Sequence, residues 1–197
     1  MRYLYLVLAG FTVFSCKINP TSEKTADTKD SLKTQTTITK DLEVKTDSIS
    51  GDFNGDGKQE KAWLVPPVFS TEDMSCADDS CVCVINFTDK SIEPIKKSQC
   101  IGGIPYNLGD LDGDGGDEIG LYPSWFTSCW GGYRVYTIKN NKSRFLVDPI
   151  TVYCDQMDQG LKPIQKDLKK KGNVIIQSSV MTDSGDIVID QKSIRLK

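Results

Sequence analysis

A ten-residue pattern that occurs twice constrains the fold of this chain more than any other feature. The first copy, at residues 51–60, reads GDFNGDGKQE, and the second, at residues 109–118, reads GDLDGDGGDE. Both fit the pattern D-x-D/N-G-D-G-x-x-E. Two copies of one loop pattern in a chain of 197 residues indicate that one supersecondary unit is repeated.

The spacing of the oxygen-bearing residues in each copy is typical of a loop that binds calcium. Calcium takes six to eight oxygen ligands at about 2.3–2.6 Å, and oxygens at alternate loop positions converge when the chain coils around the ion. The predicted ligands are Asp52, Asn54, Asp56, the Lys58 carbonyl and Glu60 in the first copy, and Asp110, Asp112, Asp114, the Gly116 carbonyl and Glu118 in the second. The alternative is a pair of Asp/Gly-rich turns that hold no ion.

The residues around these ligands exclude an EF-hand. An EF-hand needs a bidentate Glu at position 12 and flanking helices, whereas Trp63 and Leu121 occupy position 12 here. The apolar runs that follow each loop are typical of strands. We expect the apolar residue at position 2 of each loop, Phe53 or Leu111, to face the core.

The two loops resemble the FG-GAP, integrin-α-like (VCBS-like) repeats of β-propellers, in which such a loop joins two strands and holds calcium. The resemblance implies calcium ligation by the acidic and amide side chains named above. A closed propeller needs more blades than about 150 residues supply. We therefore expect a mainly β fold, either a small antiparallel β domain or a partial propeller-like fragment, with two calcium loops.

The remainder of the domain also predicts β-structure. Short runs rich in Val, Ile, Tyr and Phe are separated by turn residues, which is typical of antiparallel strands. The predicted strands are residues 61–65, 81–87, 119–122, 133–139, 145–153, 174–181 and 187–196. Asn140-Asn141 and residues 183–186 predict hairpin turns. Residues 162–171, with a proline near the start and a glycine after the end, predict one short helix.

The first 16 residues predict export and a lipid anchor. Arg2 precedes an apolar run at residues 4–14, which is too short to span a bilayer because a spanning helix needs about 20 residues. Residues 1–15 are therefore expected to be a signal peptide. The run ends at Cys16 in a pattern that resembles the lipobox of Bacteroidetes lipoproteins, which implies a lipid on Cys16. The alternative is a plain signal peptide followed by a chance cysteine.

Residues 16–45 differ in composition from the rest of the chain. They are rich in Thr, Lys, Ser and Asp and contain no aromatic residue. Such a segment cannot bury enough apolar surface to fold by itself, so we expect a flexible tether. The folded domain is then residues 46–197. We expect a cell-envelope protein held by its lipid in the outer membrane.

The other cysteines agree with export. They are Cys76, Cys81, Cys83, Cys100, Cys129 and Cys154. An even set in an exported protein predicts up to three disulfides, and Cys129 with Cys154 is the favoured pair because the two bracket a predicted hairpin. The alternative is a metal cluster on the first three of these cysteines.

Composition excludes several classes of function. The chain has no histidine and a formal net charge of −3. Catalysis by Ser-His-Asp or Cys-His arrangements is therefore excluded. A nucleic-acid-binding domain has a basic face, and the sequence predicts none, so we expect no nucleic-acid partner.

An aromatic cluster follows the second loop. Trp125, Trp130 and Tyr133 are possible ligand contacts, because exposed aromatic rings stack on sugars or bind a protein. The favoured alternative is that Trp125, Phe126 and Trp130 fill the core beside the Cys129 disulfide. We expect a module that is not an enzyme, has structural calcium and binds a protein or a glycan. The rival hypothesis is a carbohydrate hydrolase of the envelope that uses acidic residues near Trp125 and Trp130.

Overall fold

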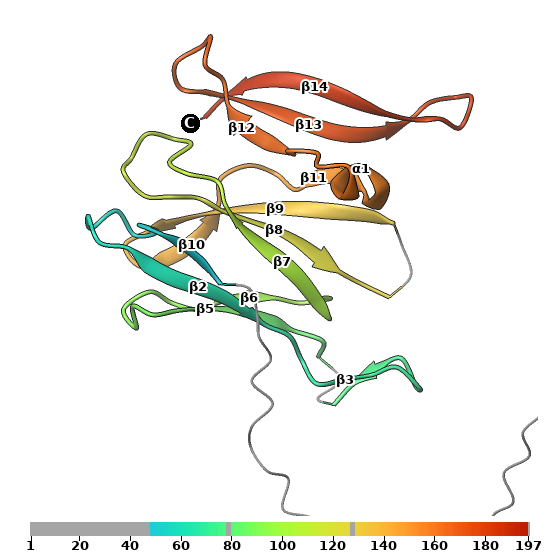
Figure 1. Cartoon of the computed structure of the whole chain (residues 1–197), viewed down its shortest axis with the longest axis horizontal. Helices are drawn as coiled ribbons and strands as arrows, with labels where there is room; N and C mark the ends of the chain where they lie inside the picture. The colour runs from blue at the N-terminus through green and yellow to red at the C-terminus, as the bar shows by residue number, and fades with distance from the viewer. Residues whose placement is uncertain (1–47, 78–79, 127–128, 197) are drawn as a thin grey trace, which may run out of the picture. The chain divides into compact units, whose positions relative to one another are not determined.

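The computed structural model describes residues 48–77, 80–126 and 129–196. The predicted signal peptide, Cys16 and the tether lie outside these residues. The described chain is mainly β, with antiparallel sheets and one short helix, as the sequence predicts (Figure 1). Within it, no helix is long and apolar enough to cross a membrane.

Many strands that are consecutive in the chain pair as antiparallel hairpins. The strands are β1 (Ile49–Gly51), β2 (Glu60–Val65), β3 (Phe69–Ser70), β4 (Ser75–Cys76), β5 (Cys83–Phe87), β6 (Ile95–Lys97), β7 (Gly102–Asn107), β8 (Ile119–Ser124), β9 (Trp130–Lys139), β10 (Lys142–Phe145), β11 (Ile150–Tyr153), β12 (Ile164–Lys166), β13 (Asn173–Met181) and β14 (Ile187–Arg195), and the helix is α1 (Cys154–Asp158).

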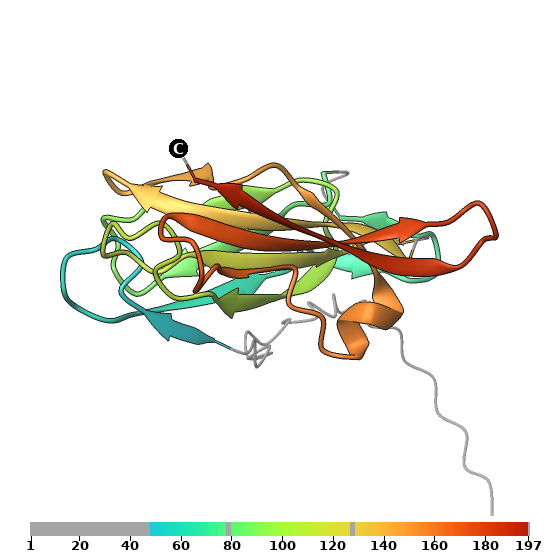
Figure 2. The same ribbon diagram turned by 90° about the horizontal axis from the view of Figure 1, so that it is seen from above.

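Three main sheets organise the described residues. The first has the order β1-β2-β5-β6, and the second has the order β10-β9-β8-β7, with β11 pairing with β9. The third is β12-β13-β14, in which β13 and β14 form a long twisted hairpin (Figure 2). β13 also packs next to β11, which places the third sheet beside the second.

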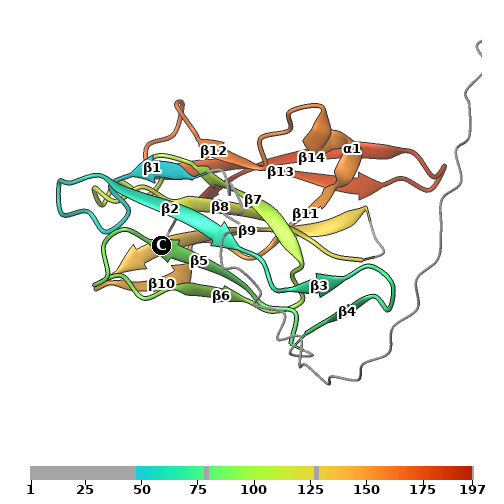
Figure 3. The ribbon, with the colours of Figure 1, turned by 60° about the horizontal axis from the view of Figure 1, so that its bottom comes forward.

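Both Asp-rich segments are the tips of hairpins. Loop 1 (residues 52–60) joins β1 to β2, where Gly51 pairs with Glu60. Loop 2 (residues 110–118) leads from β7 into β8, where Asn107 pairs with Ile119. Figure 3 shows loop 1 as the turn between β1 and β2. The expectation that a strand follows each loop is confirmed.

The loops are anchored in two hydrophobic clusters. Phe53, which is 0 % exposed, packs in the cluster built mainly from β2, β5 and β8. Leu111, which is 3 % exposed, packs in the cluster that includes β11, β12 and β13. Burying a side chain of this size contributes roughly 1.5–3 kcal/mol. The prediction that position 2 faces the core is confirmed, and each loop is tied to a different part of the core.

Three disulfides link the cysteines of the described residues. Cys129 bonds to Cys154, as favoured from the sequence. The remaining bonds are Cys76–Cys81 and Cys83–Cys100. The alternative of a metal cluster on Cys76, Cys81 and Cys83 is wrong, because each of these sulfurs is bonded to another sulfur and offers no thiolate to a metal.

The turns of two hairpins are those that the sequence predicts. Asn140 and Asn141, between β9 and β10, have φ values of 52° and 62°. Asn tolerates this left-handed region better than most residues, as a tight hairpin requires. Gly185, between β13 and β14, has a φ of 88°.

Two sequence predictions about elements are wrong. Residues 162–171 form no helix: Ile164, 3 % exposed, pairs with Ile176 in the third sheet, so burial in a strand overrides the local helical signals. Among the described residues the one helix is α1 instead. The single strand expected at residues 145–153 is interrupted. Its first residue ends β10, and β11 begins only at Ile150, because the segment between them contains Pro149, which lacks a backbone donor.

Candidate metal centre

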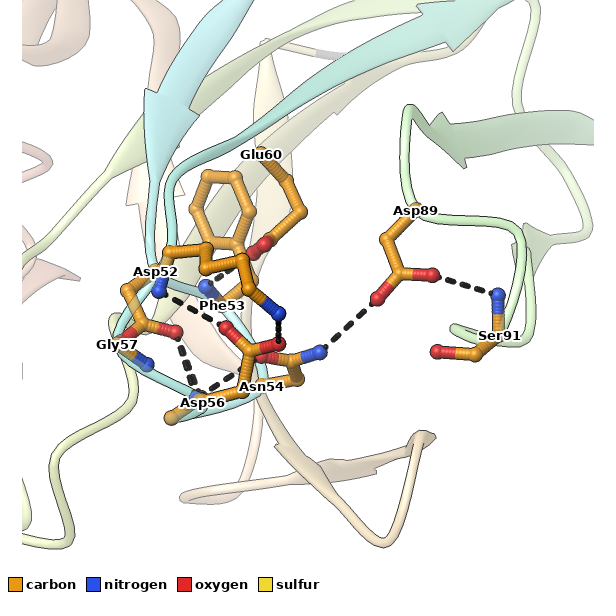
Figure 4. A network of polar contacts seen from close by, with 10 residues as sticks. Asp52, Phe53, Asn54, Asp56, Gly57, Glu60, Asp89 and Ser91 are labelled. Carbon is orange, nitrogen blue, oxygen red and sulfur yellow. Dashed lines mark hydrogen bonds and ion pairs between the residues drawn. The ribbon is translucent and has the colours of Figure 1, made fainter.

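The backbone of loop 1 coils around the side chain of its first residue. The Asp52 carboxylate accepts hydrogen bonds from the amides of Gly55 at 2.8 Å, Asp56 at 3.0 Å and Gly57 at 2.8 Å (Figure 4). These bonds join Asp52 to residues that follow it within five positions, and they hold the loop in a tight turn. Asp52 therefore organises the loop as well as supplying a carboxylate.

Glu60 closes loop 1 from the side of β2. It is 4 % exposed, and its Oε2 accepts a 3.0 Å hydrogen bond from the amide of Phe53. Burial raises the pKa of this carboxyl above its ordinary value, and the nearby negative charges of Asp52 and Asp56 raise it further. A cation in the loop would favour the ionised carboxylate and so lower the pKa of Glu60.

Three carboxylates converge in loop 1. Asp52, Asp56 and Glu60 each place one oxygen within 4.8 Å of the others. The fourth predicted side chain, Asn54, lies at the same loop but donates from Nδ2 to Asp89 at 3.2 Å (Figure 4). Asp89 follows β5 and carries no motif, so the sequence gives no signal that it adds negative charge here.

Loop 2 repeats the same arrangement. The Asp110 carboxylate accepts from the amides of Gly113 at 2.5 Å and Gly115 at 3.3 Å. Asp110, Asp112 and Glu118 place one oxygen each within 4.8 Å of one another. Each copy of the motif therefore builds a cluster of three carboxylates, from positions 1, 5 and 9 in loop 1 and from positions 1, 3 and 9 in loop 2.

Glu118 is the most perturbed group of the two loops. It is 0 % exposed, and its Oε2 accepts a 2.5 Å hydrogen bond from the amide of Leu111. Its Oε1 has no hydrogen-bond partner among the described residues. Burial raises the pKa of Glu118 to about 7; the Leu111 amide lowers it, and the negative charges of Asp112 and Asp110 raise it. A buried carboxylate oxygen without a partner costs roughly 1–3 kcal/mol or more.

The fifth position of loop 2 departs from the sequence prediction. Asp114 is not part of the converging cluster and instead forms an ion pair with Lys139, whose Nζ is also 3.7 Å from Asp112. Lys139 ends β9 and carries no motif, so only the fold brings it to the loop. In loop 1 the corresponding Asp56 pairs with the exposed Lys58 at 3.1 Å.

The two residues predicted to offer carbonyl ligands are held in the same way. The amide of Lys58 donates to Asp56 Oδ1 at 2.8 Å, and the amide of Gly116 donates to Asp114 Oδ1 at 2.9 Å. Each loop therefore fixes its seventh residue through the side chain of its fifth. This repeated contact fixes the backbone at the residue whose carbonyl completes the predicted ligand set.

The donor set of both loops fits a hard cation. All the converging groups are carboxylates, with amide and carbonyl oxygens close in sequence, and the clusters contain no nitrogen or sulfur ligand. Calcium prefers such oxygen ligands. At loop 2 the Oε1 atom of Glu118, buried and without a hydrogen-bond partner among the described residues, fits a ligand of such a cation.

The three aromatic residues predicted as possible ligand contacts are exposed to different extents. Trp125 is 40 % exposed, Trp130 is half-buried against Tyr153, and Tyr133 is 2 % exposed. Tyr133 lies in the core, where burial raises its pKa above the ordinary value, and it lines a cavity of about 620 Å³ beside Asp110. Of these three, Trp125 is the residue most available to a ligand.

The hydrolase hypothesis requires acidic residues near Trp125 and Trp130, and a cavity lies at these two residues. It has a volume of about 330 Å³ and its charged lining residues are Lys97 and Arg134. No carboxylate of the described residues lines it. A glycosidase uses a pair of carboxyl groups roughly 5–10 Å apart, so this cavity gives the hydrolase hypothesis no support.

Comparisons with known proteins add no relative. No family model matches the chain, and no curated protein and no solved structure matches it. The resemblance to FG-GAP repeats therefore rests on the two loops.

Proposed function

We propose that this protein is a lipid-anchored module of the cell envelope, not an enzyme, whose β domain binds structural calcium at loops 1 and 2 and presents a binding surface to a protein or a glycan. The observation that carries the calcium proposal is Glu118. Its carboxylate is 0 % exposed, its Oε1 has no partner among the described residues, and it converges with Asp110 and Asp112.

The proposed role of calcium is to brace the fold. Loop 1 connects strands of the first sheet, and loop 2 connects strands of the second. Three carboxylates within 4.8 Å in each loop repel one another in the absence of a cation. An ion that binds the folded chain alone stabilises it by about 2.7 kcal/mol at a hundred times its Kd.

The proposed location rests on the N-terminal sequence and on the disulfides. The apolar run that ends at Cys16 supports export and lipidation. Three disulfides are typical of a chain that matures in an oxidising compartment. The binding role is supported by exposed aromatic surface at Trp125.

Calorimetry on the full chain tests the calcium proposal. The chain is stripped with chelator, the chelator is removed, and calcium is titrated into wild type, Glu118→Gln and Asp148→Asn. The last variant is the matched control, because Asp148 is exposed between β10 and β11 and loses the same charge. We expect two sites in wild type and in the control, and a loss of loop 2 binding by at least tenfold in Glu118→Gln. Absence of calcium binding in wild type, or equal curves for both variants, contradicts the proposal.

A further inference from the structure

Two adjoining cavities form one continuous surface across β6, β8, β9 and β10. The first, of about 330 Å³, includes Trp125 and Trp130, and the second, of about 660 Å³, includes Arg144 and Phe145. They share the lining residues Lys97, Gln99 and Arg134, and none of their lining residues belongs to loop 1 or loop 2. We call the two together the cationic groove. Its elements β6 and β10 lie at the lower left of Figure 3.

The charge of the cationic groove is one-sided. Lys96, Lys97, Arg134 and Arg144 line it, and no described Asp or Glu does, although the whole chain has more acidic than basic residues. Within the described residues none of these four cations forms an ion pair. Burial lowers the pKa of Lys97, and the adjacent charge of Arg134 lowers it further. Uncompensated cations at this density favour an anionic ligand.

Two glycines on β9 shape the floor of the groove. A Cβ atom at Gly131 would lie 2.5 Å from the Tyr122 ring, and a Cβ atom at Gly132 would lie 3.1 Å from Arg134 Nη1. The ring of Tyr122 and the guanidinium of Arg134 can therefore lie against bare backbone. Any side chain at either position would have to displace one of them.

Aromatic surface is available along the groove. Trp125 is 40 % exposed in the smaller cavity, and Phe145 is 54 % exposed in the larger. Phe145 also packs on the Tyr136 ring at a centroid distance of 5.2 Å and lies 6.0 Å from the Arg134 guanidinium. Exposed aromatic rings beside cations match a ligand whose rings carry negative groups.

We propose that the cationic groove binds an anionic glycan, whose carboxylate or sulfate groups contact the cations and whose sugar rings stack on the exposed aromatic side chains. An acidic peptide would use the cations but leave the aromatic faces unused, and a neutral glycan would leave the cations unpaired. This ligand class deepens the binding role proposed above and rests on it, but it does not depend on calcium in either loop.

Titration calorimetry on the full chain, with calcium present throughout, tests the ligand class. The probe is a chondroitin sulfate hexasaccharide, and the comparison ligands are neutral maltohexaose and a glutamate hexapeptide. We expect the sulfated glycan to bind at least tenfold more tightly than either comparison ligand, since charge-assisted bonds and stacking each add affinity. Equal or tighter binding of the peptide or of the neutral glycan overturns the proposal, and so does no binding of the probe.

Two variants with the same charge change locate the site. Lys96→Gln with Arg144→Gln removes two exposed cations of the groove, and Lys142→Gln with Lys171→Gln removes two exposed cations outside it. We expect a loss of about tenfold in affinity for the probe in the first double variant and less than about twofold in the second. Equal losses in both mean that binding follows net charge alone, which overturns the groove as the site.

The variant Trp125→Ala separates a glycan from a general polyanion. We expect it to weaken binding of the chondroitin sulfate probe by about fivefold or more, because a stacked ring is lost, and to leave the weak binding of the glutamate hexapeptide unchanged. Equal effects on both ligands overturn the stacking role. A failure of these glycan titrations leaves the calcium titration unaffected, so the two proposals fail separately.

Discussion

The amide of Asp117 donates a 2.6 Å hydrogen bond to the carbonyl of Asp52, which joins loop 2 directly to loop 1. A second link runs through Asn107, whose Nδ2 donates to Ser50 at 2.8 Å and to Asp117 at 2.9 Å. The two candidate ion sites are therefore adjacent. The backbone at position 1 of loop 1 bonds to the backbone at position 8 of loop 2, next to Glu118.

This link predicts that the two sites bind calcium cooperatively. An ion in loop 1 orders the Asp52 backbone and so orders Asp117 in loop 2; coupling of this kind is typically 1–3 kcal/mol. We expect Asp52→Asn to weaken binding at loop 2 by about fivefold or more, in addition to its loss at loop 1. Calorimetry on the variant measures this effect. An unchanged affinity at loop 2 would show that the loops act independently.

The Glu118→Gln variant separates the role of this side chain as a ligand from its role in packing. In chelator the substitution removes a buried carboxyl whose Oε1 has no hydrogen-bond partner among the described residues, so the free energy of unfolding should stay the same or rise by roughly 1 kcal/mol. In calcium the variant should be less stable than wild type. Urea unfolding under both conditions gives the comparison. A variant that is strongly destabilised in chelator would mean that Glu118 is a packing residue and not an ion ligand.

The position of Lys139 beside loop 2 indicates that its ammonium weakens calcium binding there. Its ammonium pairs with Asp112 and Asp114 and would compete with a cation for the Asp112 carboxylate. The Lys139 side chain is 32 % exposed, so the ion pair contributes no more than about 1 kcal/mol. We therefore expect Lys139→Met to tighten calcium binding at loop 2 by a factor of about three to five, whereas Lys142→Met, on the same hairpin, leaves it unchanged. Weaker binding in Lys139→Met would contradict this competition.

The hydrogen bonds of Asp167, which lies outside both loops, make the stability of the fold depend on pH. Hydrogen bonds from the Ser193 hydroxyl at 2.6 Å and the Lys169 amide at 2.9 Å lower the pKa of its carboxyl below 3.8. A lowered acid pKa contributes stability that is present above the unfolded value and is lost as pH falls through the folded value. Asp167→Asn should therefore be less stable than wild type at pH 7 and lose less stability below about pH 4. Parallel acid unfolding curves for the two proteins would reject this role.

The loops were predictable because their chemistry is local. The predicted ligands of each loop lie within nine consecutive residues, and the amides that donate to the Asp52 carboxylate follow it within five residues. Phe53 and Leu111 were likewise predictable as core residues, because each is the one large apolar side chain in a polar loop and such side chains are usually buried.

The features that the sequence did not predict depend on contacts between residues that are far apart in the chain. Asp89 reaches loop 1 from the turn after β5, and Lys139 reaches loop 2 from the end of β9; neither residue carries a local signal. The strand β7 was also missed, because its two glycines and Pro105 lower the local β-propensity, and pairing with β8 along its full length overrides that. The cationic groove assembles side chains from four strands and was invisible for the same reason.

Thermal unfolding of the full chain tests the central claim most directly, that calcium in the two loops braces the β domain. The melting temperature is measured in millimolar calcium, in chelator, and in chelator followed by excess calcium, with magnesium as the comparison ion. We expect calcium to raise the melting temperature by roughly 5 °C or more, reversibly, since about 2.7 kcal/mol shifts a domain of this size by several degrees. Magnesium should give a smaller shift, because it demands tighter octahedral geometry than these loops offer. Equal melting temperatures in calcium and in chelator would contradict the account.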